Sequence, residues 1–487
     1  MDYKKIGFKA GLEIHQQLDT HKLFCECQSV LSEDTDYSFE RLLRPTQSEL
    51  GDVDKAALAE AKKNRYFRYV ASNESTCLVE ADEEPPHSAN PEAIETCLTV
   101  AALVNAIPVD EIHFMRKIVI DGSNTAGFQR TALVALGGKI DDVRIQTISL
   151  EEDAARKLNE KGKFVNYGLD RLGTPLIEIA TEPNLKSPEH AIEIAERIGL
   201  LLHATGKVKR GLGTIRQDIN VSVSKGARVE IKGVQSLSSI SKVAEKEVRR
   251  QLDLIKLEKF VQNEVRRALP DDTTEYMRPL PGAARMYPET DVQPIRITND
   301  YIKQIRRNLP EKPEVKHKRF MINYAINNEQ TKQILSSGYE NDFERLVKQF
   351  PKQKNTIIRT FLNTFSELEK EGFNIGVVNE EMIVNVFSGL SKGNYSKEAI
   401  PDILKYLVKN PDKSVEKAIE SCGLGAADTE KIKGIARKVV SERIDFVKQR
   451  GLEALGPLMG VIMKELRGKA DGKTINEILK KEIEKVI

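Results

Sequence analysis

The stretch GLEIHQQ at residues 11–17 alternates apolar and polar side chains with a period of two. In an extended strand this period sends Glu13 and His15 to one face and the intervening apolar residues to the other. The segment IRQDINVSV at 215–223 has the same alternation. Such strands are typical of an antiparallel sheet with one face on a hydrophobic core and one face toward water. The two segments therefore predict a sheet whose polar face carries several ionisable groups.

Up to about residue 298 the sequence mixes strand and helix patterns. Strand candidates are rich in Val, Ile and Thr and lie at 6–17, 115–120, 131–137, 143–150, 174–181, 214–223 and 228–235. One helix is expected to begin after Ser187, with Pro188 at its first position, and to end at Gly206. A second, long helix is expected over about 239–268. Because the connections between strands are irregular, the predicted fold class is α+β with a largely antiparallel sheet.

The character of the chain changes after the segment 279–294, which is rich in Pro and is not expected to form regular secondary structure. From about residue 299 the apolar residues follow helical spacing, and glycines separate short helices toward the end. Boundaries near 298 and 415 predict a sheet-containing domain at 1–298, an all-α domain at 299–415 and a small helical tail domain at 416–487. The tail is expected to end in an amphipathic helix at 474–487.

The 487 residues include 75 Lys plus Arg and 73 Asp plus Glu, but these charges are unevenly distributed. Residues 1–200 carry 23 positive and 34 negative charges, whereas 201–487 carry 52 and 39. The C-terminal part can therefore bind a polyanion. No run of about 18 apolar residues exists, so no membrane span is expected. Five Cys and an N-terminus unlike a secretory signal suit a cytoplasmic protein.

Common catalytic and metal-binding motifs are absent or incomplete. Residues 468–474, GKADGKT, have one residue too few between the glycines for a phosphate-binding loop, and no buried strand precedes them. The sequence has no HExxH, CxxC or GxSxG motif. Cys25 and Cys27 have the wrong spacing for a zinc knuckle, and no ligands neighbour Cys77 and Cys97, so we predict structural thiols.

The functional interpretation of the polar face is a site for a hard cation. Glu178 stands alone among apolar residues in TPLIEIA at 174–180, and a buried carboxylate must be solvated or matched by a cation. Mg²⁺ prefers carboxylate and phosphate oxygens. Candidates for the cation are His15, Glu152, Glu178 and Asp218, and candidates for the phosphates of a nucleotide are Arg216 and Lys232. The alternative is a solvated face without any site, which the alternation alone favours.

A series of motifs resembles one known family. They are GLEIHQQL at 11–18, DEEPPH at 82–87, MRKIVIDGSNTAGFQR at 115–130, ISLEEDAAR at 148–156, LDRLGTPLIEIATEPNL at 169–185, IRQDINVSV at 215–223, EIKGVQ at 230–235 and YMRPLPGAARMYPETD at 276–291. In this order they resemble the GatB/GatE family, and within it the GatE subunit of the archaeal glutamyl-tRNA(Gln) amidotransferase, a relative of bacterial GatB. The segment 456–481 resembles the YqeY-like helical tail domain of both subunits.

The resemblance implies a two-step reaction that uses ATP and Mg²⁺. ATP phosphorylates the γ-carboxylate of Glu esterified to tRNA(Gln), and ammonia then displaces the phosphate to give Gln-tRNA(Gln). The ammonia comes from glutamine or asparagine in a separate, asparaginase-like amidotransferase subunit, GatD, and the family suggests a heterotetramer. Phosphorylation turns a very poor leaving group into a good one. A chain that only phosphorylates and amidates needs no nucleophile motif of its own, in agreement with the motifs that are missing here.

The resemblance also implies roles for individual residues. The metal ligands would be His15, Glu152 and Glu178. Glu13, Asp218 and Arg216 would be catalytic, and Glu13 and Asp218 could also support a second metal. Arg216 and Lys232 would bind ATP, and Gly173 and Thr174 would lie beside the substrate. The basic helical part, 299–487, would hold tRNA through its phosphates.

The chain departs from the family in one respect. GatE carries an inserted domain similar to one of bacterial aspartyl-tRNA synthetases, and here residues 257–269 leave no room for it. Either this is a naturally compact member or the domain was removed by engineering. Two other functions remain open: a GatB-like subunit that works with an amidase and also handles Asp-tRNA(Asn), and a non-catalytic tRNA-binding protein of the same fold.

Overall fold

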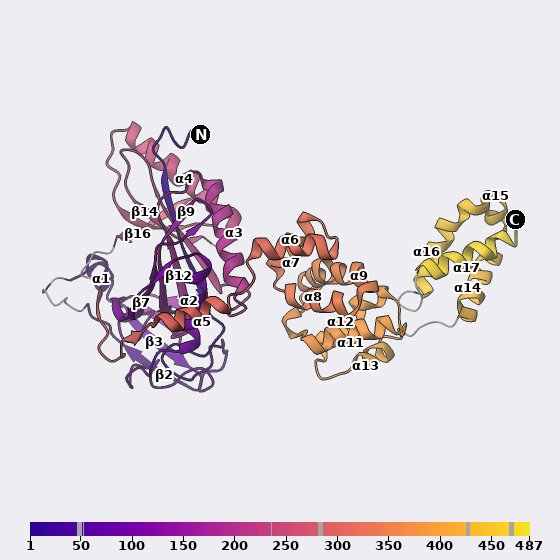
Figure 1. Cartoon of the computed structure of the whole chain (residues 1–487), viewed down its shortest axis with the longest axis horizontal. Helices are drawn as coiled ribbons and strands as arrows, with labels where there is room; N and C mark the ends of the chain where they lie inside the picture. Colours follow the sequence, from indigo (N-terminus) through magenta and orange to yellow (C-terminus); the bar gives the residue numbers. More distant parts are fainter. Residues whose placement is uncertain (46–50, 52, 235, 281–285, 425–428, 467–471) are drawn as a thin grey trace. The chain divides into compact units, whose positions relative to one another are not determined.

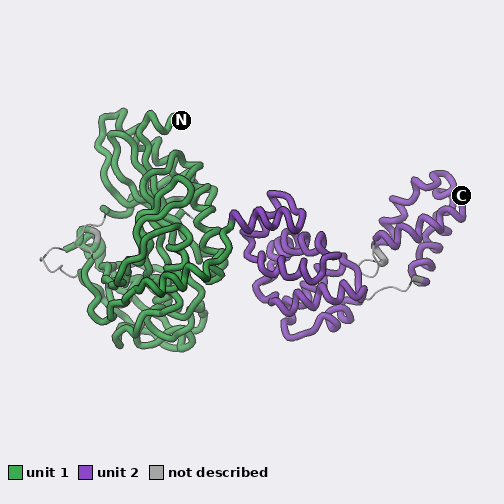
Figure 2. Tube along the Cα trace, viewed as in Figure 1, with its two compact units in different colours: residues 1–313 green, residues 314–487 purple. Residues whose placement is uncertain are grey.

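The computed structural model describes all residues except 46–50, 52, 235, 281–285, 425–428 and 467–471. It divides into two compact units, Met1–Pro313 and Glu314–Ile487 (Figure 2). The strands of the first unit are β1 (Lys9–Gln17), β2 (Tyr37–Arg41), β3 (Tyr66–Ala71), β4 (Ile107–Pro108), β5 (Glu111–Ile112), β6 (Phe114–Ile118), β7 (Phe128–Leu136), β8 (Lys139–Ile140), β9 (Val143–Glu152), β10 (Arg156–Lys161), β11 (Phe164–Gly168), β12 (Pro175–Thr181), β13 (Ile215–Ser222), β14 (Val229–Val234), β15 (Glu264–Ala268), β16 (Thr274–Pro279), β17 (Met286–Pro288) and β18 (Ile295–Arg296). Its helices are α1 (Lys55–Ala61), α2 (Pro91–Leu103), α3 (Pro188–Ala204), α4 (Leu237–Lys256) and α5 (Asn299–Arg307).

The large sheet of the first unit has the strand order β16-β15-β14-β13-β1-β12-β9-β7-β6-β17. Its strands pair antiparallel except β14 and β15, which are parallel, so the predicted largely antiparallel sheet and α+β class are confirmed. A smaller sheet has the order β10-β11-β3-β2. The sequence patterns did not predict this smaller sheet. Its strand β10 is mostly exposed and lacks apolar alternation, and β2 is only five residues long, so its alternation of Tyr37 and Phe39 with polar residues is a short signal.

Helices α2, α3 and α4 pack against one face of the large sheet (Figure 1). The apolar residues of the alternating strands, such as Leu12 and Ile14 of β1, belong to one buried hydrophobic core together with Ile198 of α3 and Val243 of α4. Burial of each large aliphatic side chain stabilises the fold by about 1.5–3 kcal/mol. The opposite face is therefore the polar one.

Helix α3 begins as predicted. The Ser187 hydroxyl accepts a hydrogen bond from the backbone N–H of His190 at 3.1 Å, and Pro188 occupies the first position, where no intrahelical N–H bond is lost. After the C-terminal cap residue Thr205, Gly206 takes a positive φ of 66°, which ends the helix.

The predicted helix over 239–268 is wrong in its second half. Helix α4 ends at Lys256, and Glu258 takes a positive φ of 54°, which turns the chain out of the helix. Val265 is then buried in β15, parallel to β14. Part of the Pro-rich segment is regular, because Met286–Pro288 forms the edge strand β17 beside β6. Pro is tolerated at this edge, where an N–H is not required.

The second unit is helical, as predicted from residue 299 onward. Its helices are α6 (Pro313–Tyr324), α7 (Asn328–Ser337), α8 (Glu340–Gln349), α9 (Lys354–Arg359), α10 (Phe365–Lys370), α11 (Glu380–Ser391), α12 (Ile400–Lys409), α13 (Val415–Ser421), α14 (Thr429–Glu442), α15 (Ile444–Arg450), α16 (Leu455–Leu466) and α17 (Gly472–Glu484). Helices α14 to α17 share a hydrophobic core of their own, whereas α13 packs against α11 and α12. Among the described helices, none is long and apolar enough to cross a membrane.

Helix α5 belongs to the first unit. It packs against α2 and adds Ile305 to the core of that unit. The first unit therefore extends past the boundary that the sequence suggests near 298, up to Pro313.

Candidate metal and nucleotide site

The polar face of the large sheet lines a cavity of about 990 Å³. His15 on β1 lies opposite Glu178 on β12 and opposite Arg216 on β13. Glu13 lies opposite Asp218, two residues along on the same face. Because aligned residues of neighbouring strands point to the same side of a sheet, the strand pairing brings together side chains that are far apart in the sequence.

The first group of ligand-type residues consists of His15, Glu151 and Glu178, whose ligand atoms lie within 4.8 Å of one another. Nε2 of His15 is 3.3 Å from Oε2 of Glu178. Burial opposes the charge of His15, but its hydrogen bond to Glu178 and the nearby carboxylates raise the pKa of the imidazole. Burial likewise opposes the charge of Glu178, yet His15 holds the pKa of that carboxyl well below its usual value. One imidazole and two carboxylates suit a divalent cation such as Mg²⁺ or Mn²⁺.

Glu151, and not the expected Glu152, joins this group. Glu178 lies opposite Ser149 on β9, so the residue two positions further, Glu151, shares its face and Glu152 points to the other side. The carboxylate of Glu152 accepts a hydrogen bond from the backbone N–H of Arg130 at 2.8 Å and lies 3.6 Å from its guanidinium. Burial, partly offset by Arg130, raises the pKa of Glu152. The period of two could have given this assignment if the register of β9 against β12 had been known.

A second group consists of Glu13, Asp218 and Glu230, again with ligand atoms within 4.8 Å. Nζ of Lys232 lies 2.8 Å from Asp218 and 2.7 Å from Glu230. Burial and the charge of Glu230 raise the pKa of Glu13. Burial opposes the charge of Lys232, but the surrounding carboxylates raise the pKa of its ammonium. Glu230 was not predicted as a site residue, although it follows the same alternation as Lys232.

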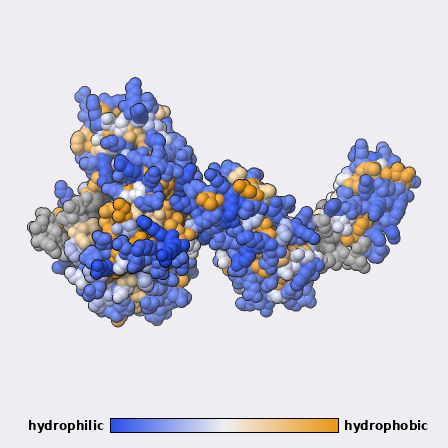
Figure 3. All heavy atoms as spheres, in the orientation of Figure 1, coloured by the Kyte–Doolittle hydropathy of each residue, from blue (hydrophilic) through white to orange (hydrophobic). Residues whose placement is uncertain are grey.

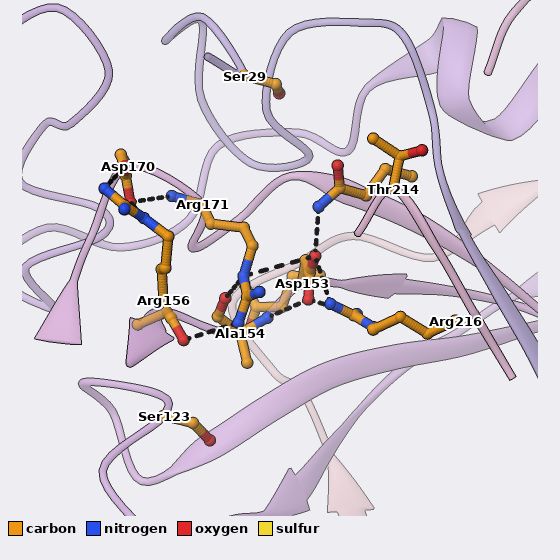
Figure 4. A network of polar contacts seen from close by, with 12 residues as sticks. Ser29, Ser123, Asp153, Ala154, Arg156, Asp170, Arg171, Thr214 and Arg216 are labelled. Carbon is orange, nitrogen blue, oxygen red and sulfur yellow. Dashed lines mark hydrogen bonds and ion pairs between the residues drawn. The ribbon is translucent and has the colours of Figure 1, made fainter. Parts of the chain in front are cut away.

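Arg216 is held by a buried network that the sequence did not reveal (Figure 4). Its guanidinium donates to Oδ1 of Asp153 at 2.7 Å, and the amide of Gln17 donates to Oδ2 of the same carboxylate at 2.7 Å. The guanidinium of Arg171 lies 3.8 Å from Asp153. Burial opposes the charge of Asp153, but Arg216 and Arg171 lower the pKa of this carboxyl. The network fixes the Arg216 side chain at the wall of the cavity.

The two predicted substrate residues lie elsewhere. Gly173 lines a small enclosed cavity of about 20 Å³ together with Glu80, Arg130 and Glu152. Thr174 is buried, and its carbonyl accepts a hydrogen bond from the backbone N–H of Asp153 at 2.7 Å. Neither residue lines the large cavity. Contact of Gly173 and Thr174 with a substrate stays a prediction.

A third group of ligand-type residues lies on two loops beyond β1 and β3. Ligand atoms of Cys25, Cys27, Cys77 and Glu80 lie within 4.8 Å of one another. Burial, with the charge of Glu80, raises the pKa of Cys25, and the same causes raise the pKa of Cys77 to about 11. Three thiols and one carboxylate form a donor set that suits tetrahedral Zn²⁺, which would displace the thiol protons.

The prediction that Cys77 lacks neighbouring ligands is therefore wrong. The loop of Cys25 and Cys27 meets the turn of Cys77 and Glu80 only in the folded chain, so spacing along the sequence could not reveal the group. Cys97 differs from these thiols, since it is buried in the hydrophobic core on α2.

Both units of the chain match known protein families of the same kind of enzyme subunit. Residues 8–303 match the family described as the GatB/GatE catalytic domain, and residues 341–483 match the GatB domain family. The chain is 40% identical to the E subunit of the glutamyl-tRNA(Gln) amidotransferase of Methanocaldococcus jannaschii, with 100% of both chains covered. It is 38% identical to the corresponding proteins of Methanococcus maripaludis strain C7 and Methanosarcina barkeri, with 100% of this chain and 99% of each relative covered.

The alignments with these relatives extend over 627 to 629 positions, whereas this chain has 487 residues. The relatives therefore contain residues without counterpart here, and the absence of a large insert is confirmed. The matched regions include all strands that line the cavity. From its two matching domains and its similarity over the full length of these relatives, the chain belongs to the GatE family, the E subunits of glutamyl-tRNA(Gln) amidotransferases.

Proposed function

We propose that this chain is the ATP-dependent subunit of a tRNA-dependent amidotransferase that converts Glu-tRNA(Gln) to Gln-tRNA(Gln). The observation that carries the proposal is the convergence of two carboxylate groups with Arg216 and Lys232 in one cavity. Carboxylates that can hold Mg²⁺, beside cations that can hold phosphates, are the groups that phosphoryl transfer requires. Membership of the GatE family supports glutamyl-tRNA(Gln) as the substrate.

Each group of the cavity has a task in this proposal. His15, Glu151 and Glu178 would hold Mg²⁺, which when bound neutralises charge on the phosphate oxygens. Arg216 would bind a phosphate with its guanidinium already oriented by Asp153, so that little side-chain freedom is lost on binding. Lys232 would contribute a second positive charge beside Glu230 and Asp218.

The chemistry uses only groups of the substrates. An oxygen of the glutamyl γ-carboxylate attacks the γ-phosphorus of ATP, the bond to the bridging oxygen breaks, and ADP leaves. The nitrogen of ammonia then attacks the acyl carbon, and phosphate leaves with the electron pair of the broken C–O bond while the amide nitrogen loses a proton. No nucleophilic side chain is required, in agreement with the missing nucleophile motif.

The partners of the chain follow from the same assignment. Ammonia would come from an asparaginase-like subunit in a hetero-oligomer, since the chain contains no motif for glutamine hydrolysis. The helical second unit would contribute to binding of the tRNA phosphates. The face of this unit that is visible in Figure 3 carries hydrophilic residues with smaller hydrophobic patches between them.

A tRNA-dependent ATPase and phosphorylation assay tests the proposal. The full chain, with its asparaginase-like partner, is given Glu-tRNA(Gln), ATP and Mg²⁺, and ADP and Gln-tRNA(Gln) are measured. Glu178→Ala should lower the rate roughly 100-fold or more, because it removes a metal ligand. The matched control is Glu182→Ala, since Glu182 follows the same strand but pairs with the exposed Arg144 outside the cavity.

Three outcomes would contradict parts of the proposal. Near-normal phosphorylation by Glu178→Ala would refute the metal assignment. Binding of tRNA by the unaltered chain without any ATP hydrolysis would identify a non-catalytic RNA-binding protein. Activity that requires an amidase in place of an asparaginase-like partner would assign the chain to an enzyme that works like the GatB type.

A further inference from the structure

Arg278 on the edge strand β16 lines the same cavity and has no role in the mechanism above. It belongs to the motif YMRPLPG at 276–282, one of the motifs that resemble the GatE family, and the described residues of this motif are not in the metal groups. In the strand pairing Arg278 lies opposite Val265, which in turn lies opposite Glu230. Arg278 therefore points to the same side of the sheet as Glu230 and Lys232, from two strands away.

The other cations on the wall of the cavity are paired. Lys117 lies 2.5 Å from Glu151 and Arg216 lies 2.7 Å from Asp153. Lys232 is held between Asp218 and Glu230, and the guanidinium of Arg228 donates to Asn220 at 2.9 Å. Within the part of the chain that the structure describes, the side chain of Arg278 has no such hydrogen bond or ion pair.

A half-buried guanidinium without a partner has given up part of its hydration and gained no ion pair in return. The carboxylates that line the cavity cannot easily supply that pair, because they are gathered in the two metal groups or held by other cations. An anionic group of a ligand can supply this ion pair. The guanidinium presents parallel N–H donors that match two oxygens of a phosphate.

The position of Arg278 favours a phosphate that is also reached from β14. Two strand spacings, roughly 10 Å, separate the backbone of β16 from that of β14. The long side chains of Arg278 and Lys232 extend from these two strands over the same face, so one phosphate group between them can contact both. The carboxylates of the second group lie beside this point and would hold a cation on the other side of the phosphate.

We propose that Arg278 is a nucleotide-binding residue that holds a phosphate of ATP from the β16 side of the cavity, opposite Lys232. This inference rests on the proposed function and adds to it a phosphate contact on the edge strand of the sheet.

Binding of a non-hydrolysable ATP analogue with Mg²⁺ to the full chain, measured by calorimetry, tests the inference. Arg278→Ala should weaken binding roughly tenfold or more, because a charge-assisted, two-pronged contact is lost. Arg278→Lys should bind with intermediate affinity, since it keeps the charge and loses the planar fork. The control is Arg267→Ala on the adjacent strand β15, where the guanidinium is exposed and pairs with Glu275 at 2.6 Å; its affinity should match that of the unaltered chain.

The outcomes separate this inference from the proposed function. If the unaltered chain binds the analogue and both Arg278 variants bind it equally well, the inference is overturned and the proposed function stands. If the affinity for the analogue is unchanged but KM for Glu-tRNA(Gln) rises, Arg278 contacts the aminoacyl-tRNA and the inference is again overturned. If the unaltered chain does not bind the analogue at all, the proposed function fails and the inference with it. An unchanged melting temperature of Arg278→Lys shows that a loss of affinity does not come from misfolding.

Discussion

Glu151 and Glu152 are neighbours in the sequence, yet they act on opposite faces of β9. Glu151 faces the cavity, where Lys117 and the amide of Gln129 donate to its carboxylate at 2.5 and 3.1 Å. Glu152 faces the interior and is held by Arg130. The difference follows from the period of two and from the register that sets Glu178 opposite Ser149.

Substitution of each of these two glutamates by glutamine separates their roles. Glu151→Gln should lower the Mg²⁺-dependent affinity for nucleotide roughly 10- to 100-fold, because an anionic ligand of the metal is lost. Glu152→Gln should leave nucleotide affinity near that of the unaltered chain, because the amide stays outside the cavity and Arg130 keeps its ion pair with Glu289 at 2.7 Å. Titration of both variants with Mg²⁺ or Mn²⁺ at fixed nucleotide concentration measures the effect. The reverse order of sensitivity would show that Glu152 is the ligand.

At the residue scale the alternation placed several residues of the cavity wall on one face of the sheet, although by itself it favoured a solvated face without a site. His15, Glu178, Asp218, Arg216 and Lys232 all lie on the cavity wall as expected. The residues that were missed depend on contacts between distant segments. Asp153 follows the last residue of β9 and orients the side chain of Arg216, which lies on β13. No local sequence pattern encodes such a pairing.

At the scale of elements, the sequence predicted the strands well where apolar and polar residues alternate strongly. It failed where contacts between distant segments determine the secondary structure. The strands that carry the site were found within a few residues of their observed bounds. The end of α4 was missed because the apolar spacing continues beyond Lys256, whereas the chain turns at Glu258 and Val265 is buried beside β14. Packing against the sheet has here overridden a local helical pattern.

The two loops that gather Cys25, Cys27, Cys77 and Glu80 lead to a prediction about metal content. We expect the purified chain to contain about one Zn²⁺ in this group, because the donor set and its spacing suit a closed tetrahedral site. Cys77→Ser should lose this metal and lower the stability by on the order of 2 kcal/mol or more. Elemental analysis and thermal unfolding measure both effects. Cys422→Ser is the matched control, since that thiol is exposed and lies outside the group; equal zinc content in both variants would refute the site.

At the scale of the whole molecule, the chain consists of two units with separate cores. All residues that line the large cavity lie within Met1–Pro313, and none of them lies in the helical unit Glu314–Ile487. The uneven charge of the sequence agrees with this division only in part. Residues 201–250 lie in the first unit and are rich in Lys and Arg, and Arg216 and Lys232 among them are paired inside the cavity.

Removal of residues 314–487 tests this division of labour. The fragment 1–313 should bind the Mg²⁺–ATP analogue with the affinity of the full chain, because it retains the whole cavity and its own core. Its affinity for tRNA(Gln) should fall roughly tenfold or more at low salt, since phosphate contacts of the helical unit are lost. Calorimetry and filter binding at two salt concentrations give both values. Equal tRNA affinity of fragment and full chain would mean that the first unit alone binds the tRNA.

The ladder of hydrogen bonds that aligns β9, β12, β1 and β13 also limits how this protein can change in evolution. If His15, Glu151 and Glu178 hold one cation as proposed, its ligands come from three different strands, and a one-residue shift of β9 that brings Leu150 to the place of Glu151 would leave the cavity without this carboxylate. We therefore expect a one-residue deletion within these strands to be more harmful than most substitutions. The turn at 269–273 between β15 and β16 lies outside these paired strands, and we expect it to tolerate changes in length better. Variation among homologous genes should accordingly appear as substitutions in the strands and as insertions in the connections.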